Sequence, residues 1–166
     1  MQLPSYHNKL LSRVTAAELA VIEPLLEPVD LPKGFTMALP EEAIEHIYFL
    51  EQGLGSIVSV SPEGQKAEAG MFGFEGFSPT PPAIGSSKSF HEVTMQAAGH
   101  GYRIRLEDFL ALMPNCQAFW DLLHRYAHNL ATQVSYTALT NAIHQTDERL
   151  ARGCLCATTG CGRMSS

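Results

Sequence analysis

The stretch of sequence that decides the fold is Ile44-Glu45-His46-Ile47-Tyr48-Phe49-Leu50-Glu51-Gln52-Gly53-Leu54-Gly55-Ser56-Ile57-Val58-Ser59-Val60. Two runs rich in β-branched and aromatic residues flank the break at 52–55, which predicts a strand, a glycine turn and a returning strand. Residues 61–64 (Ser-Pro-Glu-Gly) are a second turn signal, so we expect a third strand after them. Antiparallel strands at this spacing need a second layer, which predicts a small roll or sandwich.

The composition indicates a globular chain with one sizeable core. Of 166 residues, 45% are apolar and 17% are charged, which is typical of folded rather than disordered chains. No apolar run reaches membrane-spanning length and the N-terminus lacks the form of a signal peptide, so we expect a cytoplasmic protein with no membrane partner. The formal net charge of −6 argues against nucleic-acid binding by this chain alone.

Around the central stretch we expect an N-terminal helical segment (1–26) and a β-roll (27–106). A helix is predicted over 8–26, where Thr15 and Glu18 form a capping box. Short strands are expected at 29–31, 35–39 and 66–72, followed by a long irregular loop at 73–88 that is rich in glycine, proline and serine. Two further strands, 92–96 and 102–106, are separated by a turn at 97–101, which brings the roll to about eight strands.

After residue 106 the apolar period becomes helical, and a region over 107–145 follows. We expect a short helix at 107–112 and a long one over about 115–143, which lacks Pro and Gly. Apolar residues spaced by three and four predict a seam that pairs with a second copy of the chain; the alternative is one helix packing on its own roll. The seam residues are Trp120, Leu123, Ala127, Leu130 and Val134.

The predicted fold class is therefore α+β. It consists of an antiparallel double-stranded, jelly-roll-like β-roll flanked by an N-terminal helix and a long C-terminal dimerisation helix. Residues 146–166 would be a separate region, in which a helix starts at Thr146 and the helical pattern is lost after Arg152.

Three motifs in this order resemble the Crp/Fnr transcription regulators: Ile-Glu-His-Ile-Tyr-Phe-Leu-Glu-Gln-Gly at 44–53, Gly-Phe-Glu-Gly at 73–76, and Glu-Arg-Leu-Ala-Arg at 148–152. The resemblance covers about residues 8–152. It is to members whose sensor domain has the cyclic-nucleotide-binding fold without an obvious cyclic-nucleotide pocket. It implies the sensor and dimerisation half of a regulator, which is not an enzyme, forms a homodimer and responds to an unknown small-molecule effector or a partner.

In relatives that bind cyclic nucleotides, the loop matching 73–88 holds the ligand, with a glutamate on the ribose and an arginine on the phosphate. Here Glu75 approximates the glutamate, the acid Glu92 stands where the arginine is expected, and Lys88 is the only cation in the loop. We therefore expect no cyclic-nucleotide cofactor, and either a different pocket or a purely structural loop. The candidate ligand-binding residues are Gly73, Phe74, Glu75, Gly76, Ser86, Ser87, Lys88 and Glu92.

The histidines allow a metal site, but their pattern favours other roles. His124 and His128 are four residues apart on the long helix, although a solvated helix face explains this spacing better. His46, His91 and His100 could line a roll as in a cupin metalloenzyme, yet the His-x-His and following Glu of such a site are absent. We therefore predict no catalytic residues and no metal.

The C-terminal tail departs from the family pattern. Cys154, Cys156 and Cys161 look like half of a metal or iron–sulfur site, without a fourth ligand. Our hypothesis is that residues 153–166 are a frame-shifted, prematurely ended remnant. The chain would then lack the helix-turn-helix and could not bind operator DNA specifically. Only a full-length form would bind DNA. The alternative is a stand-alone ligand- or protein-binding module with this fold and a genuine tail.

Overall fold

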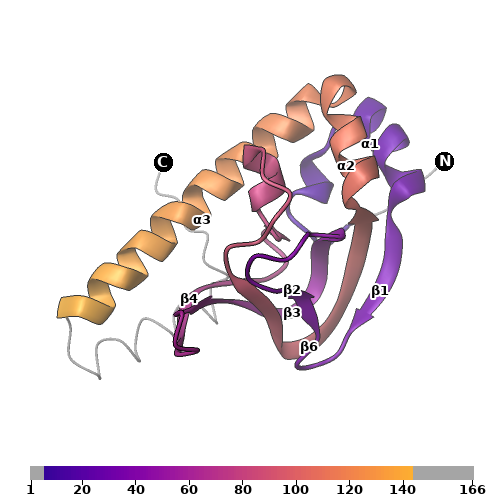
Figure 1. Ribbon diagram of the computed structural model, residues 1–166. Coiled ribbons are helices and arrows are strands. Elements are labelled where there is room, and N and C mark those ends of the chain that lie inside the picture. The colour runs from indigo at the N-terminus through magenta and orange to yellow at the C-terminus, as the bar shows by residue number, and fades with distance from the viewer. Residues whose placement is uncertain (1–5, 144–166) are drawn as a thin grey trace.

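The computed structural model describes residues 6–143 (Figure 1). The N-terminal helices and α2 gather at one end of the roll, and α3 runs along its side (Figure 1). The predicted helix start at Thr146, the motif at 148–152 and the cysteine-containing tail lie outside the described residues. The elements are η1 (Leu11–Arg13), α1 (Ala16–Ile22), η2 (Glu23–Leu25), β1 (Glu27–Leu31), β2 (Thr36–Ala38), β3 (His46–Val60), β4 (Lys66–Phe72), β5 (Phe77–Ser78), η3 (Pro81–Ile84), β6 (Glu92–Arg105), α2 (Leu106–Leu112), η4 (Met113–Asn115) and α3 (Gln117–Ile143).

The sheet is built on two long antiparallel strands, β3 and β6, which pair from His46↔Arg105 to Val58↔Glu92. One half of this pair carries β1 on β6 and β5 on β3, and the other half carries β2 on β6 and β4 on β3. Each long strand therefore serves two small layers, which fold over one another to form the roll. The predicted α+β class and antiparallel roll are confirmed.

The predicted turns at 52–55 and 97–101 are wrong, because both segments lie inside the long strands. Gly53 has φ 103°, and the pairing register shifts around it, so the glycines form bulges rather than a hairpin. A Cβ atom on Gly99 would lie 1.9 Å from the Gln52 carbonyl oxygen, so only glycine allows the strands to cross this closely. The sheet has six strands within residues 6–143 instead of about eight, because β3 and β6 each take the place of two predicted strands.

The local signals at the chain's turns and caps are confirmed more often. Thr15 caps α1, where its hydroxyl accepts a hydrogen bond from the Glu18 amide at 3.3 Å. The 61–64 turn is present, with the Ser61 amide donating to the Gln65 carbonyl at 2.8 Å. The single helix predicted over 8–26 is wrong, because the chain forms η1, α1 and η2 in succession and Val14 is extended.

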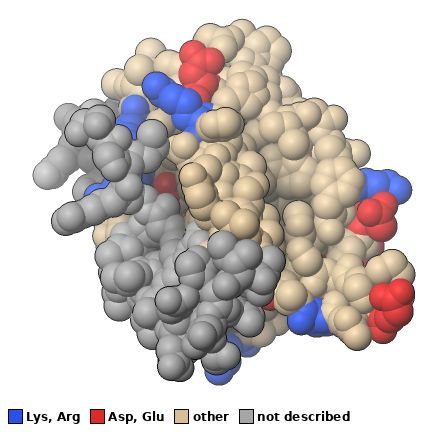
Figure 2. All heavy atoms as spheres, turned by 90° about the vertical axis from the view of Figure 1, so that its left-hand side faces the viewer, with Lys and Arg blue, Asp and Glu red and all other residues tan. Residues whose placement is uncertain are grey.

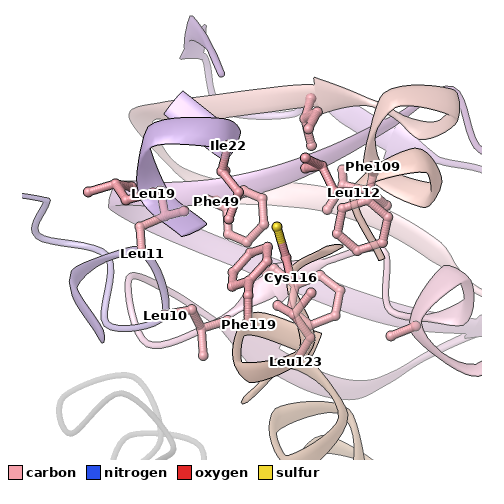
Figure 3. Close-up of a cluster of buried hydrophobic side chains, with 14 of the residues drawn as sticks. Leu10, Leu11, Leu19, Ile22, Phe49, Phe109, Leu112, Cys116, Phe119 and Leu123 are labelled. Carbon is pink, nitrogen blue, oxygen red and sulfur yellow. The ribbon is translucent and has the colours of Figure 1, made fainter. Parts of the chain in front are cut away.

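The core has two parts, and α3 packs on both. In the first, aromatic side chains of the sheet's outer face meet the helices, with Phe49 between Ile22 and Phe119 (Figure 3). The second part fills the roll and includes Leu50, Phe72 and Met95. Leu123 of α3 belongs to the first part and Leu130 to the second, so burial of apolar area fixes the long helix on the roll.

Candidate functional site

The predicted ligand loop, 73–88, has regular structure. It contains the two-residue strand β5 and the 3₁₀ turn η3, which has Pro at its start and ends at Gly85 in a left-handed conformation with φ 88°. Proline at the first position supplies a favourable φ, and glycine allows the left-handed end. The loop predicted as irregular is therefore a folded segment with defined ends.

At the start of this loop, Gly73–Gly76 form a tight turn, closed by a 3.3 Å hydrogen bond from the Gly76 amide to the Gly73 carbonyl. Glu75 folds back onto the same turn, and its Oε1 atom accepts a hydrogen bond from the Gly73 amide at 2.9 Å. Its other carboxylate oxygen, Oε2, is buried and has no hydrogen-bond partner among the described residues. The acid that matches the family's ligand glutamate thus stabilises its own backbone.

The N-terminal segment covers this turn. The ring of Phe74 stacks on His7, with centroids 4.6 Å apart and an interplanar angle of 17°. The Lys9 amide donates to the Phe74 carbonyl at 2.7 Å. Asn8 is fully buried, and its side-chain amide donates to the carbonyls of Gly76 at 2.9 Å and Leu50 at 3.0 Å. No sequence motif marks His7 or Asn8 as a neighbour of the Gly73–Gly76 turn, so sequence reasoning missed both.

The long helix α3 contacts the same loop directly. A Cβ atom on Gly76 would lie 2.0 Å from the Tyr126 ring, so the turn and the helix are in close contact. The His124 Nε2 donates to the Ala83 carbonyl of η3 at 2.6 Å, and the His124 ring packs on Trp120 at 4.6 Å. Short contacts therefore join the 73–88 loop to α3.

The remaining candidate ligand residues lie elsewhere. The Ser86 hydroxyl accepts a hydrogen bond from the Lys88 amide, and the Ser87 carbonyl accepts one from the Ile44 amide at 2.9 Å. Glu92 forms an ion pair with Lys66 of β4 at 2.6 Å. Within residues 6–143, no hydrogen bond or ion pair joins these four residues to the Gly73–Gly76 turn. Binding of a ligand by the eight candidates stays a prediction.

The five predicted dimer residues all pack within the chain. Leu123 and Leu130 are 0% and 5% exposed, Trp120 and Ala127 pack against the first part of the core, and Val134 packs against the second. The packing of one helix on its own roll accounts for these contacts. A homodimer, and the part that these five residues would take in it, stays a prediction.

The structure also contains a pocket of about 450 Å³ that sequence reasoning missed. It lies between β2, the first residues of β3 and Arg103 of β6, and none of the eight candidate ligand residues lines it. Its histidine, His46, has a pKa below the usual value, because burial and then the nearby Arg103 disfavour the charged ring. No local motif marks this pocket, because its walls come from three separate segments.

Within the described residues, no three His, Cys, Asp or Glu side chains come close enough to hold a metal ion. His124 instead bonds to the Ala83 carbonyl, which gives that ring a structural partner. In the same part of the chain, no helix is both long and apolar enough to cross a membrane.

This architecture is that of the sensor domains of Crp/Fnr-type regulators and related cyclic-nucleotide-binding domains. A transcriptional regulator of the Crp/Fnr family from Eubacterium rectale has a TM-score of 0.75 at 13% identity, over 92% of this chain and 72% of that chain. The c-di-GMP responsive global regulator CLP from Xanthomonas campestris has a TM-score of 0.70 at 14% identity, over 86% and 72%. The sensor domain of the transcriptional regulator DNR from Pseudomonas aeruginosa has a TM-score of 0.59 at 16% identity, over 78% and 87%.

Sequence comparison does not assign the chain to a family. No protein-family model matches the chain, and no curated protein matches it. At identities of 13 to 16%, the structural likeness establishes the fold.

Proposed function

We propose that this chain is the sensor and dimerisation part of a Crp/Fnr-type transcription regulator. The observation that carries this proposal is the direct contact of the 73–88 loop with α3, through Tyr126 on Gly76 and His124 on the Ala83 carbonyl. A ligand or partner that moves the loop would move the long helix, and a regulator can use such a movement. The neighbours are regulators and sensor domains, which supports a binding rather than a catalytic role.

The effector proposed for this loop is not a cyclic nucleotide bound in the usual way. A buried phosphate needs a buried cation, but the loop has no arginine and its lysine, Lys88, is exposed. Glu92, where the arginine is expected, is engaged with Lys66. One neighbour is named as responsive to c-di-GMP, so this fold serves more than one effector. Calorimetry with cyclic AMP and cyclic GMP tests the point, and micromolar binding of either would contradict it.

We propose a homodimer through the outward face of α3. The helix has no charged residue from Tyr126 to Ile143, although Ala131, Ser135, Tyr136 and Leu139 are exposed. On the part of this side that the grey atoms leave visible, the charged side chains lie mainly toward the margins (Figure 2). An uncharged exposed helix face that includes the large side chains of Tyr136 and Leu139 favours contact with another protein surface, and a second copy is the simplest partner.

Sedimentation tests the dimer with a matched pair of variants. Leu139 is 52% exposed on α3, whereas Ile84 is 72% exposed on η3. Leu139→Glu is expected to raise the dimer dissociation constant by about tenfold or more, because it places a charge in the interface. Ile84→Glu should leave the constant unchanged. A wild-type chain that is monomeric at high micromolar concentration would instead favour a stand-alone binding module.

A second measurement tests the coupling between loop and helix. Trp120 is the only tryptophan of the chain and packs on His124, which bonds to η3, so its fluorescence is sensitive to the position of the His124 ring. His124→Ala should shift this fluorescence and also change the dimer dissociation constant. A shifted fluorescence with an unchanged constant would show that loop and dimer are independent.

We further propose that this chain does not bind operator DNA specifically. Its net charge is −6, and Arg125 is the only Lys or Arg in α3, so the clustered cations that phosphate contacts require are missing from the described helix. A mobility-shift assay that gave nanomolar, sequence-selective binding would overturn this.

A further inference from the structure

The pocket between β2, β3 and Arg103 is a second candidate ligand site, separate from the 73–88 loop. Its volume of about 450 Å³ lies in the range of small-molecule sites. It is joined to the end of the loop, since Ala43 in its wall forms a bridge with Lys88. Its lining residues are Phe35, Thr36, Met37, Ala38, Leu39, Glu42, Ala43, Glu45, His46, Tyr48 and Arg103.

Aromatic rings form one wall of the pocket. Phe35 meets Tyr48 edge to face, with centroids 5.9 Å apart, and His46 lies 6.2 Å from Tyr48. Tyr48 is 5% exposed, and its burial raises the pKa of its phenol, so the hydroxyl stays protonated. That hydroxyl has no hydrogen-bond partner in residues 6–143, so it can bond to a ligand.

One cation lines the pocket. The Nε of Arg103 bonds to Glu27 at 2.9 Å, while its two terminal nitrogens have no hydrogen-bond partner within the described part of the chain. The side chain is 37% exposed and borders the pocket. These two terminal nitrogens form a planar fork, in which one N–H of each can bond to one of the two oxygens of a carboxylate.

Two acidic residues also line the pocket. Glu42 and Glu45 are both exposed at its edge, and neither forms an ion pair with any described residue. A ligand with only a negative charge would be attracted by Arg103 and repelled by these two acids, and one with only a positive charge would meet the reverse. A ligand with both charges matches all three side chains.

We propose that this pocket binds a small zwitterion with an apolar or aromatic body, such as an amino acid. The ligand's carboxylate bonds to Arg103, its ammonium lies toward Glu42 and Glu45, and its body packs on Phe35 and Tyr48. This is a second ligand site, separate from the loop, and it does not depend on the regulatory role proposed above. Its occupancy would also act on the loop, through the Ala43–Lys88 bridge.

Three probes of one shape test the charge pattern by calorimetry. L-Phenylalanine carries both charges, 3-phenylpropanoate lacks the ammonium, and 2-phenylethylamine lacks the carboxylate. L-Phenylalanine is expected to bind at least about tenfold more tightly than either of the others, because each lost ion contact costs that much or more. Equal binding of the three, tighter binding of one of the single-charge probes, or no binding of L-phenylalanine at millimolar concentration would overturn the proposal.

A matched pair of variants separates the pocket role of Arg103 from its ion pair. Arg103→Gln removes both, and should weaken L-phenylalanine binding by about tenfold or more. Glu27→Gln removes the ion pair alone and leaves the guanidinium in the pocket, so affinity should be kept or increased. Urea unfolding of both variants checks the fold. Equal losses of affinity in the two variants would show that Arg103 acts only through Glu27.

Discussion

The Gly73–Gly76 turn and the Arg103 pocket belong to the same roll, and they differ in how far the chain already uses their polar groups. In the turn, Glu75 accepts a hydrogen bond from the backbone of Gly73, and the N-terminal segment and α3 cover it. In the pocket, the terminal nitrogens of Arg103 are available to a ligand.

This difference shows that a residue can match a family's ligand motif and still have its polar group bonded to its own turn, as Glu75 does. A carboxylate that is held by its own turn stabilises the fold, and a ligand must displace that contact before it binds. The terminal nitrogens of Arg103, which have no hydrogen-bond partner in the described residues, carry no such cost. Substitutions at the turn should therefore lower stability, and substitutions in the pocket should change ligand binding or the pH dependence of stability.

The largest effect is expected for Asn8→Ala. The buried side chain of Asn8 donates to two carbonyls and accepts from the amides of Leu10 and Leu11. Alanine leaves these groups buried without partners, so the free energy of unfolding should fall by about 3 kcal/mol. Urea denaturation measures this, with Asn115→Ala, at an exposed position, as the control. A loss no larger than that of the control would mean that the N-terminal segment does not hold the turn.

A smaller effect is expected for Gly76→Ala, which tests the contact between the turn and α3. Its Cβ atom would lie 2.0 Å from the packed Tyr126 ring, so one of the two must shift, at about 2 kcal/mol of stability. In a Tyr126→Ala background the same change should cost much less, since the space is then open. An equal cost in both backgrounds would place the strain in the backbone of the turn instead.

Sequence reasoning predicted the fold where the deciding signal is local. Thr15 and Glu18 lie within one turn of helix, and the 61–64 turn is complete in four residues. The glycines at 53 and 99 were misassigned because a glycine in a turn and a glycine in a bulge give the same local signal. The long-range approach of β3 and β6 decides between them.

The site was only partly predictable for the same reason. The Gly73–Gly76 motif was found, but the contact of Asn8 with Gly76 spans 68 residues and has no sequence signature. The apolar spacing from Trp120 to Val134 identified a buried helix face correctly, yet it could not tell whether a second helix or the chain's own roll covers it. The pocket was missed because its lining residues share no motif.

The smallest effect is expected at the pocket's histidine, and it concerns pH rather than the fold. Burial and then Arg103 lower the pKa of His46, whereas Glu45 and Glu27 act in the opposite direction with smaller effect and Arg105 lowers the pKa further. A group whose folded pKa is depressed loses stabilising effect as pH falls below its unfolded pKa of about 6.5, because the unfolded state then binds the extra proton. The wild-type free energy of unfolding should therefore decline between about pH 6.5 and 5 more steeply than that of His46→Gln.

Parallel urea titrations of the two proteins at several pH values measure this difference. His91, whose pKa is also lowered by burial, contributes a slope of the same sign, so His46→Gln should reduce the slope without abolishing it. Adding His91→Gln should then reduce it further. If His46→Gln has a slope equal to or steeper than that of the wild type, the ring is not held neutral beside Arg103. The pocket would then contain two positive charges and would favour a simple anion over a zwitterion.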